Sequence, residues 1–393
     1  MMVLVVFGYQ TVLAQTTDDE VKKELKVKPT VKLSGRIQYD FEFLSKKVNT
    51  DSTTTVAGSE FRRVYLAASG KIYKNIKYKA QFEFAGAKIG YRDVYVKFTK
   101  LPGIGGNFTF GSFAEPTGLE MMTSSKYIPF FERAMLTNTQ NFRWNSGFMY
   151  DNFDLFNKKL GLQVSYTFNG KHNEGFKDAN MKRGGHFVAR LTSPILFDKD
   201  NHRLVHVGVN YENRKRSENP ADYTLKFRTE NHMWQHKTAL SFSKLENQSD
   251  IGFELATDLG PFSFQGEYEI ATYNTVDKAY NVNGYYAAVT YFITGDHRGY
   301  KNGAYSRIKP FTNMCIKDGD FGALELVARY SVEDFSSLIT TGNNDKVANI
   351  DLGMNWYLNS HTRIMYNFNI SDFNESGDNN KLYAHVMRLQ ADF

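Results

Sequence analysis

The chain has 393 residues, of which 15% are aromatic and 23% charged, and its mean hydropathy is −0.47. Its single cysteine, Cys315, excludes an intramolecular disulfide and a thiolate metal cluster, and we assign no metal or cofactor. The net charge of +6 would suit nucleic acid, but no recognition motif occurs, so a basic surface or an anion-lined channel explains it better.

Residues 1–15 are predicted to be a signal peptide. An apolar stretch leads to the small-residue pattern Val12-Leu13-Ala14, and a polar segment at 16–30 follows. No Lys or Arg precedes Lys22, so a truncated signal and a start further upstream both stay open, as does an apolar tail. The rest, 31–393, is predicted to form a single domain.

Alternation with a period of two runs through most of that domain. In Val31–Phe43, apolar residues occupy one parity and charged or polar residues the other, and residues 76–85 and 261–272 repeat the pattern. About sixteen or seventeen such segments reach the roughly 9–11 residues of a membrane strand. Backbone groups in lipid must all be paired. We therefore predict an all-β protein, a closed antiparallel transmembrane β-barrel of sixteen strands, with eighteen as the alternative.

The turns divide into two lengths, which predicts long loops on one side of the barrel and short turns on the other. Short turns are expected at Asn75, Gly260-Pro261 and Asn359-Ser360. Long loops are expected at Lys46–Ser59, Ala114–Asn141, Lys171–Gly184, Asn213–Glu230, Gly295–Lys309, Val332–Lys346 and Ser371–Asn380. The alternation that ends on Phe393 resembles the signal by which outer-membrane barrels engage their assembly machinery.

Several blocks resemble the phosphate-selective porin O and P family. They are Glu60–Leu66 with Ser69–Lys71, Gly111–Glu120, Thr123–Tyr127, Phe131–Arg133, Tyr291–Arg298, Glu325–Ser331 and Leu352–Asn359. The blocks are scattered over nearly the whole chain after the predicted signal. The resemblance implies a sixteen-stranded barrel in the outer membrane of a Gram-negative bacterium, usually a homotrimer surrounded by lipid. It also implies a loop, here Ala114–Asn141, that folds inward and narrows the pore.

Family members that select phosphate bind the anion through arginines at the constriction. The resemblance carries this role to Arg36, Arg63 and Arg133, and then to Arg62 and Tyr65. Guanidinium donors match phosphate oxygens in pairs, and lysines add a field that attracts anions. The predicted basic pore lining consists of Lys32, Lys71, Lys77, Lys79 and Lys126. We expect passive diffusion of small anions such as phosphate.

Other functions stay open. Inward parity also belongs to acidic residues such as Asp40, Glu42 and Asp93, so a general or saccharide-permeating porin would look similar. An outer-membrane barrel enzyme or a structural barrel is the alternative from another class, although no nucleophile elbow or phosphate loop occurs. His202 and His206 are four residues apart, about 13 Å along a strand, which is too far for one metal ion.

Overall fold

The computed structural model describes residues 28–48, 52–87, 89–139, 144–168, 184–215, 219–232, 239–338, 346–375 and 378–393. The predicted signal peptide, residues 16–27 and nearly all of the predicted loop Lys171–Gly184 lie outside these ranges. Within them, no helix is both long and apolar enough to cross a membrane.

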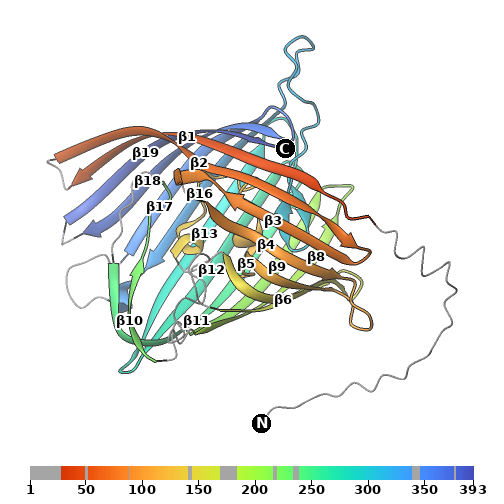
Figure 1. Ribbon diagram of the computed structural model, residues 1–393. Helices are drawn as coiled ribbons and strands as arrows, with labels where there is room; N and C mark the ends of the chain where they lie inside the picture. The colour runs from red at the N-terminus through yellow and green to blue at the C-terminus, as the bar shows by residue number, and fades with distance from the viewer. Residues whose placement is uncertain are drawn as a thin grey trace, which may run out of the picture.

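The described chain is almost entirely strand (Figure 1). The strands of the main sheet are β1 (Lys32–Val48), β2 (Ser52–Tyr73), β3 (Ile76–Glu83), β4 (Gly90–Thr99), β5 (Asn107–Ala114), β6 (Trp144–Leu155), β7 (Leu160–Phe168), β8 (Gly185–Asp198), β9 (Arg203–Arg214), β10 (Ala221–Lys226), β11 (Ala239–Leu259), β12 (Phe262–Thr275), β13 (Ala279–Phe292), β16 (Ala323–Asp334), β17 (Lys346–Tyr357), β18 (Thr362–Glu375) and β19 (Asp378–Asp392). The shorter elements are η1 (Ala85–Ala87), α2 (Leu119–Met122), α3 (Met135–Thr139), β14 (Gly299–Lys301), β15 (Ala304–Ser306) and η2 (Ser336–Leu338).

Sequential antiparallel pairing closes these strands into a barrel. β1 pairs with β2 on one side and with β19 on the other, from Arg36↔Asp392 to Val48↔Asn380. The sheet counts seventeen strands in the described residues, because β10 pairs only with the first part of β11 and is an addition to the sixteen that form the wall. The predicted sixteen-stranded closed barrel is confirmed.

Burial is inverted relative to a water-soluble protein. The largest fully buried side chains include Arg190, Arg214, Arg363 and Arg388, whereas apolar side chains such as Phe41 and Leu389 are nearly half exposed. Along β13 and β19 the two classes alternate residue by residue. Exposed apolar residues belong on a lipid-facing wall, and buried polar residues belong in a lumen packed with side chains. The faces predicted from the alternation are therefore the faces observed, with the apolar residues outside the barrel and the polar residues inside it.

Two parts of the loop prediction are wrong. The predicted loop Lys46–Ser59 is mostly strand, since β1 and β2 stay paired up to Val48↔Ser52. The same holds for Ser371–Asn380, where β18 and β19 stay paired to Glu375↔Asp378. These stretches are polar on both faces, so no apolar alternation indicates a strand.

The second error concerns the segment Gly295–Lys309. The sequence predicts it beside the other long loops, but it follows β13 at the end of the barrel that carries the short turns. Tyr291 of β13 pairs with Phe262, which lies next to the turn Gly260-Pro261. We call this the short-turn end. The segment carries the β14–β15 hairpin, and Tyr305 of β15 is buried with Leu119, Leu204 and Ala256. An inward course explains its length, since the hairpin fills space inside the barrel.

Candidate functional site

Residues 115–139, the constriction loop, fold into the barrel directly after β5, as predicted, and carry α2 and α3. Side chains of the wall satisfy the loop's backbone carbonyls. Arg388 donates to the Phe131 carbonyl at 2.7 Å, Arg363 to the Ile128 carbonyl at 2.9 Å, and Asn355 to the Pro129 carbonyl at 2.8 Å. A buried carbonyl without a donor is costly, so these polar wall residues fix the path of the loop.

Carboxylates hold the two short helices. Glu267 of β12 accepts hydrogen bonds from the backbone N–H groups of Leu119 and Glu120 at 2.9 and 2.8 Å, which caps the start of α2. Glu120 in turn accepts from the Ala134 N–H at 2.9 Å and the Thr137 hydroxyl at 2.8 Å, ahead of and within α3. The Glu267 contacts therefore place α2 against β12, on the far side of the barrel from β1–β6, and the Glu120 contacts tie α2 to α3 within the loop.

Glu132 is the anchor on the side of β2. Arg62 binds both of its oxygens, at 2.7 and 3.0 Å, while the guanidinium groups of Arg63, Arg388 and Arg228 approach to 3.4, 3.6 and 3.6 Å. Burial alone would raise the pKa of Glu132, but the arginines outweigh it and hold that pKa well below the ordinary value. The carboxylate is therefore ionised throughout the neutral range.

A β-bulge explains how two successive arginines reach the same carboxylate. The register of β1 against β2 shifts between Gln38↔Arg63 and Tyr39↔Phe61, which leaves Arg62 as the extra residue. A bulge re-aims the extra side chain, so Arg62 joins Arg63 on the lumen side. Because both arginines face Glu132, the predicted anion-binding residues Arg62 and Arg63 have a carboxylate partner already.

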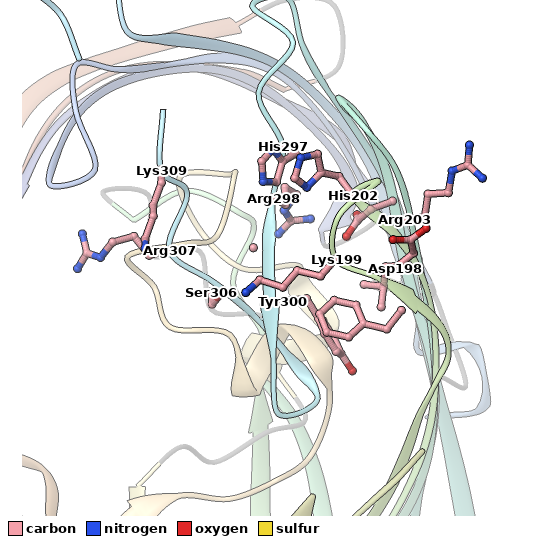
Figure 2. A pocket seen from close by; sticks show the side chains of 14 residues that line it. Asp198, Lys199, His202, Arg203, His297, Arg298, Tyr300, Ser306, Arg307 and Lys309 are labelled. Carbon is pink, nitrogen blue, oxygen red and sulfur yellow. The ribbon is translucent and has the colours of Figure 1, made fainter. Parts of the chain in front are cut away.

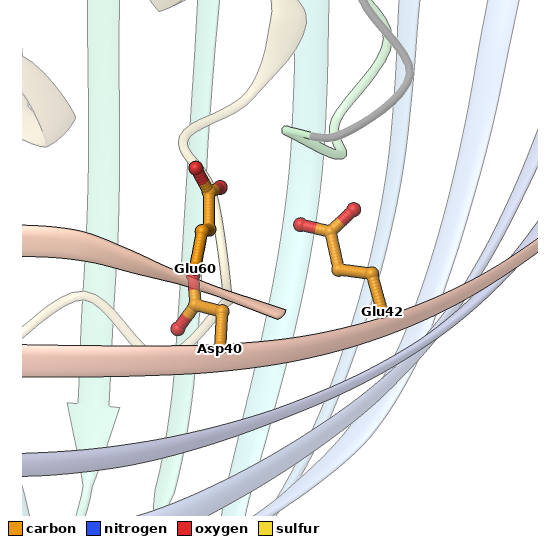
Figure 3. Close-up of side chains that lie close together, drawn as sticks. All are labelled: Asp40, Glu42 and Glu60. Atoms are coloured by element: carbon orange, nitrogen blue, oxygen red, sulfur yellow. The ribbon is translucent and has the colours of Figure 1, made fainter. Parts of the chain in front are cut away.

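Asp40, Glu42 and Glu60 lie close together on the neighbouring parts of β1 and β2 (Figure 3). Arg388 binds both oxygens of Asp40 at 2.7 Å, and His232 contacts Glu60. These partners account for two of the three carboxylates, so the cluster balances the arginines around Glu132 and is not assigned to a metal.

A cavity of about 310 Å³, which we call the central cavity, lies between the constriction loop and β1–β6. Its charged lining residues are Arg36, Lys79, Asp93, Lys97, Lys126 and Arg133. Lys79 pairs with Asp93 and Lys97 pairs with Asp151, each at 2.5 Å. Lys126 lies 3.6 Å from Asp392. The two arginines are therefore the cations of this lining that have no carboxylate within ion-pair distance among the described residues.

Arg36 and Arg133 are held by neutral groups. Arg36 donates to the Ser125 hydroxyl at 2.6 Å and lies over the Tyr65 ring at 4.2 Å. Arg133 donates to the backbone carbonyls of Glu120 and Thr123 at 3.0 and 2.6 Å. One N–H group of each, Nε of Arg36 and Nη1 of Arg133, has no hydrogen-bond partner in the described chain. Both side chains are nearly fully buried, and both line the central cavity. Each therefore brings one positively charged N–H group without an acceptor to that cavity.

The sequence model for the family described as phosphate-selective porin O and P matches residues 31–393. The chain belongs to the phosphate-selective porin O and P family. It is accordingly a porin of the outer membrane of a Gram-negative bacterium, as predicted.

Porin O of Pseudomonas aeruginosa is 28% identical over 379 residues, which cover 85% of this porin and 81% of the relative. Among solved structures, the anion-selective porin from Comamonas acidovorans is 13% identical with a TM-score of 0.56, over 93% of this chain and all of the other. OmpT of Vibrio cholerae in its trimer form is 14% identical with a TM-score of 0.53, over 92% and 99% of the two chains. At such identities the structural matches establish the barrel fold alone.

The remaining predicted residues of the porin divide by position. Tyr65, Lys79 and Lys126 line the central cavity together with Arg36 and Arg133. Lys32, Lys71 and Lys77 are exposed near the short-turn end, where Lys71 pairs with Lys77 across the β2–β3 hairpin, and they do not line this cavity. Whether they feed anions to the pore stays a prediction.

Sequence reasoning missed Ser125, Lys97 and Trp144 in the cavity lining. Lys97 has inward parity in β4, so the alternation would have found it. Arg92 was also missed, and it stacks on Trp144 at 4.4 Å. A second bulge, opposite Gln81, places Arg92 inward beside Asp93, and parity carries no signal for that.

The opposite half of the lumen contains cations that are already neutralised. Arg190 makes two hydrogen bonds to Glu254, at 2.7 and 2.6 Å, and His206 contacts the same carboxylate at 3.1 Å. Arg214 lies 2.9 Å from Glu212 and 3.4 Å from Glu115. These pairs fill the space inside β7–β11 with side chains whose charges cancel, in contrast to the central cavity.

Proposed function

We propose that this porin conducts small anions by passive diffusion and that Arg36 and Arg133 hold an oxyanion such as inorganic phosphate in the central cavity. The observation that carries the proposal is the pair of unpartnered N–H groups, one on each arginine, at the same cavity. The family description and the names of Porin O and the anion-selective porin support it.

The charge distribution favours anions over cations at this point. Of the charged side chains that line the central cavity, five are basic and Asp93 is acidic. Burial lowers the pKa of Arg133 to about 10, and burial also lowers the pKa of Lys126. Arg133 therefore stays protonated at neutral pH. Conduction also requires release, and donors bound partly to neutral carbonyls attract an anion without the strength of a full ion pair.

The ion preference is tested by the reversal potential of single channels across a potassium chloride gradient. We expect anion selectivity in the native porin, a clear loss of it in Arg36→Gln and in Arg133→Gln, and no change in the matched control Lys278→Gln, which removes the same charge at an exposed position. Unchanged selectivity in both arginine variants would refute the assignment.

Phosphate itself is tested by its block of the chloride current. Each arginine offers charge-assisted hydrogen bonds, so its replacement should weaken block by about tenfold. A general or saccharide-permeating porin is the second candidate, and it predicts that maltodextrins reduce the current while phosphate does not. Tyr65 and Trp144 at the cavity are the aromatic surfaces that favour it.

We further propose a homotrimer, because one of the similar solved structures is described in a trimer form, and conduction in place of catalysis. Light scattering of the detergent-solubilised protein tests the first, and the absence of hydrolytic activity in the folded channel tests the second. Contact with outer-membrane lipid and with the barrel-assembly machinery through β19 and Phe393 belongs to the same proposal.

A further inference from the structure

A second cavity, the vestibule cavity, lies at the short-turn end of the barrel and has a volume of about 250 Å³ (Figure 2). It is formed where the inward segment after β13 approaches the β8–β9 turn and β11. Its lining includes the cations Lys199 and Arg298, the imidazoles of His202 and His297, and the carboxylates Asp198 and Asp258. Nothing in the constriction mechanism uses this cavity.

Arg298 is the organising side chain of the vestibule cavity. It is 6% exposed and is held by neutral groups, since its Nη1 donates to the Gln265 side-chain oxygen at 3.2 Å and its guanidinium lies 3.3 Å from the centre of the Tyr305 ring. Its Nη2 has no hydrogen-bond partner among the described residues. A buried guanidinium with a free N–H is costly unless an acceptor reaches it.

The carboxylates of the cavity are occupied elsewhere. Asp198 accepts from the backbone and side-chain nitrogens of Asn201 at 3.1 and 2.7 Å within the β8–β9 turn. Asp258 accepts from the Tyr305 hydroxyl at 3.0 Å. Neither is available as a direct partner for Arg298, although both lower the local potential.

Further donors converge on the same space. Figure 2 shows the ammonium group of Lys199 extending toward Ser306 and the imidazoles of His202 and His297 next to Arg298. The two imidazoles are stacked, with ring centres 3.4 Å apart. A fixed guanidinium, an ammonium, a hydroxyl and imidazole N–H groups form the donor set that suits a tetrahedral oxyanion, whose oxygens accept from several directions.

We propose that the vestibule cavity is a second oxyanion-binding site, in which Arg298 is the principal donor and Lys199 with the stacked histidines completes the shell. The occupant is an inorganic oxyanion of the size of phosphate or sulfate that arrives through the pore or from the short-turn end. The proposal rests on the proposed anion passage only for how the ion enters, because the donor set is formed independently of Arg36 and Arg133.

The contact between the hairpin and the constriction loop separates the two sites. The Tyr305 N–H donates to the Thr123 hydroxyl at 3.3 Å, and Tyr305 packs against Leu119 of α2. An ion in the central cavity therefore lies on one side of this contact, and an ion beside Arg298 lies on the other. Block by an ion added at the short-turn end should depend on Arg298 more strongly than block from the loop end.

The test is single-channel chloride current in a planar bilayer, with inorganic phosphate added in turn to each face at neutral pH. We expect Arg298→Gln to weaken phosphate block from the face at the short-turn end by about tenfold, because one charge-assisted donor is lost. Block from the face at the loop end should stay within twofold of the native value. The matched control is Lys301→Gln on the same hairpin, an exposed charge outside the vestibule lining, and it should behave as the native porin.

The outcomes separate the two proposals. Block from both faces unchanged in Arg298→Gln overturns the vestibule site. A channel without anion selectivity that still loses phosphate block in Arg298→Gln refutes the proposed constriction function but supports this site. If Arg298→Gln forms no channels, Lys199→Gln and His297→Gln replace it, and full phosphate block in both then overturns the proposal.

Discussion

Replacing Glu132 with Gln should have two effects: it should destabilise the barrel, and it should increase the preference of the pore for anions. Glu132 is 2% exposed and binds Arg62 through both oxygens, with three further guanidinium groups within 3.6 Å. The variant keeps the size of the side chain but leaves four arginines around a neutral amide. Removing one partner of a buried ion pair costs about 3–5 kcal/mol. The contribution of Glu132 is present above the ordinary carboxyl pKa and is lost only when pH falls through its depressed folded-state pKa, so neutral pH shows the full effect.

The assay is thermal unfolding of the folded porin in detergent at pH 7, followed by circular dichroism. We expect the apparent Tm of Glu132→Gln to fall by roughly 5–10 °C. The matched control is Asp372→Asn, because Asp372 is half exposed and lies 3.6 Å from an equally exposed Lys381, a pair worth about 0–1 kcal/mol. Anion selectivity should increase in Glu132→Gln, opposite to Arg133→Gln. Equal Tm values for the two carboxyl variants would refute the view that Glu132 anchors the constriction loop.

Three further predictions concern the loop and the titration of the two cavities. Gly118→Ala should lower the apparent Tm and disturb the single-channel current, because a Cβ there would collide with the Glu267 carboxylate that caps α2; an unaltered current would show that α2 does not set the constriction. Anion selectivity of the native porin should stay constant between pH 7 and pH 8.5, because burial lowers the pKa of Arg133 only to about 10, and a fall of the reversal potential within this range would show that a weaker base sets the selectivity. Sulfate block through the vestibule should strengthen only below about pH 6.5, the ordinary histidine pKa, because burial and His202 lower the pKa of His297, and the double variant His202→Gln/His297→Gln should be insensitive to pH in this range. The charged groups that surround His297 in this titration are Asp198, Lys199, Arg203, Asp258, Asp296, Arg298, Arg307 and Lys309.

The barrel could be predicted from the sequence because lipid imposes a simple rule. Every outward position of a spanning strand must be apolar and every backbone group must be paired, so alternation reports both the strand and its orientation. The lumen parity of Arg36, Asp40 and Lys79 followed directly from this rule. Hairpins that project beyond the apolar band are free of the rule, which is why the paired strands up to Val48↔Ser52 were mistaken for a loop.

The candidate site was only partly predictable, since its decisive features are not periodic. The bulge that places Arg62 beside Arg63 inserts one residue into β2, and nothing in the local residue pattern indicates it. The sequence also does not indicate which hydrogen-bond or ion-pair partner an arginine of the lumen will have. Arg63 and Arg133 carry the same charge, yet one faces Glu132 and the other donates to backbone carbonyls of its own loop.

The partners of the arginines determine the conduction path. A guanidinium fixed by a carboxylate, as Arg190 is by Glu254, presents little net field and serves to fill the lumen. A guanidinium fixed by neutral oxygens, as Arg133 is, keeps its field and part of its donor capacity. Carboxylate-bound arginines occur on both sides of the lumen, as Arg62 on β2 and Arg190 on β8 show. An anion that crosses the barrel is therefore attracted most strongly by the arginines held by neutral groups, which line the two cavities. Giving Arg36 a carboxylate partner through Ser125→Asp, at the hydroxyl that Arg36 contacts at 2.6 Å, should therefore lower anion selectivity while every arginine remains in place.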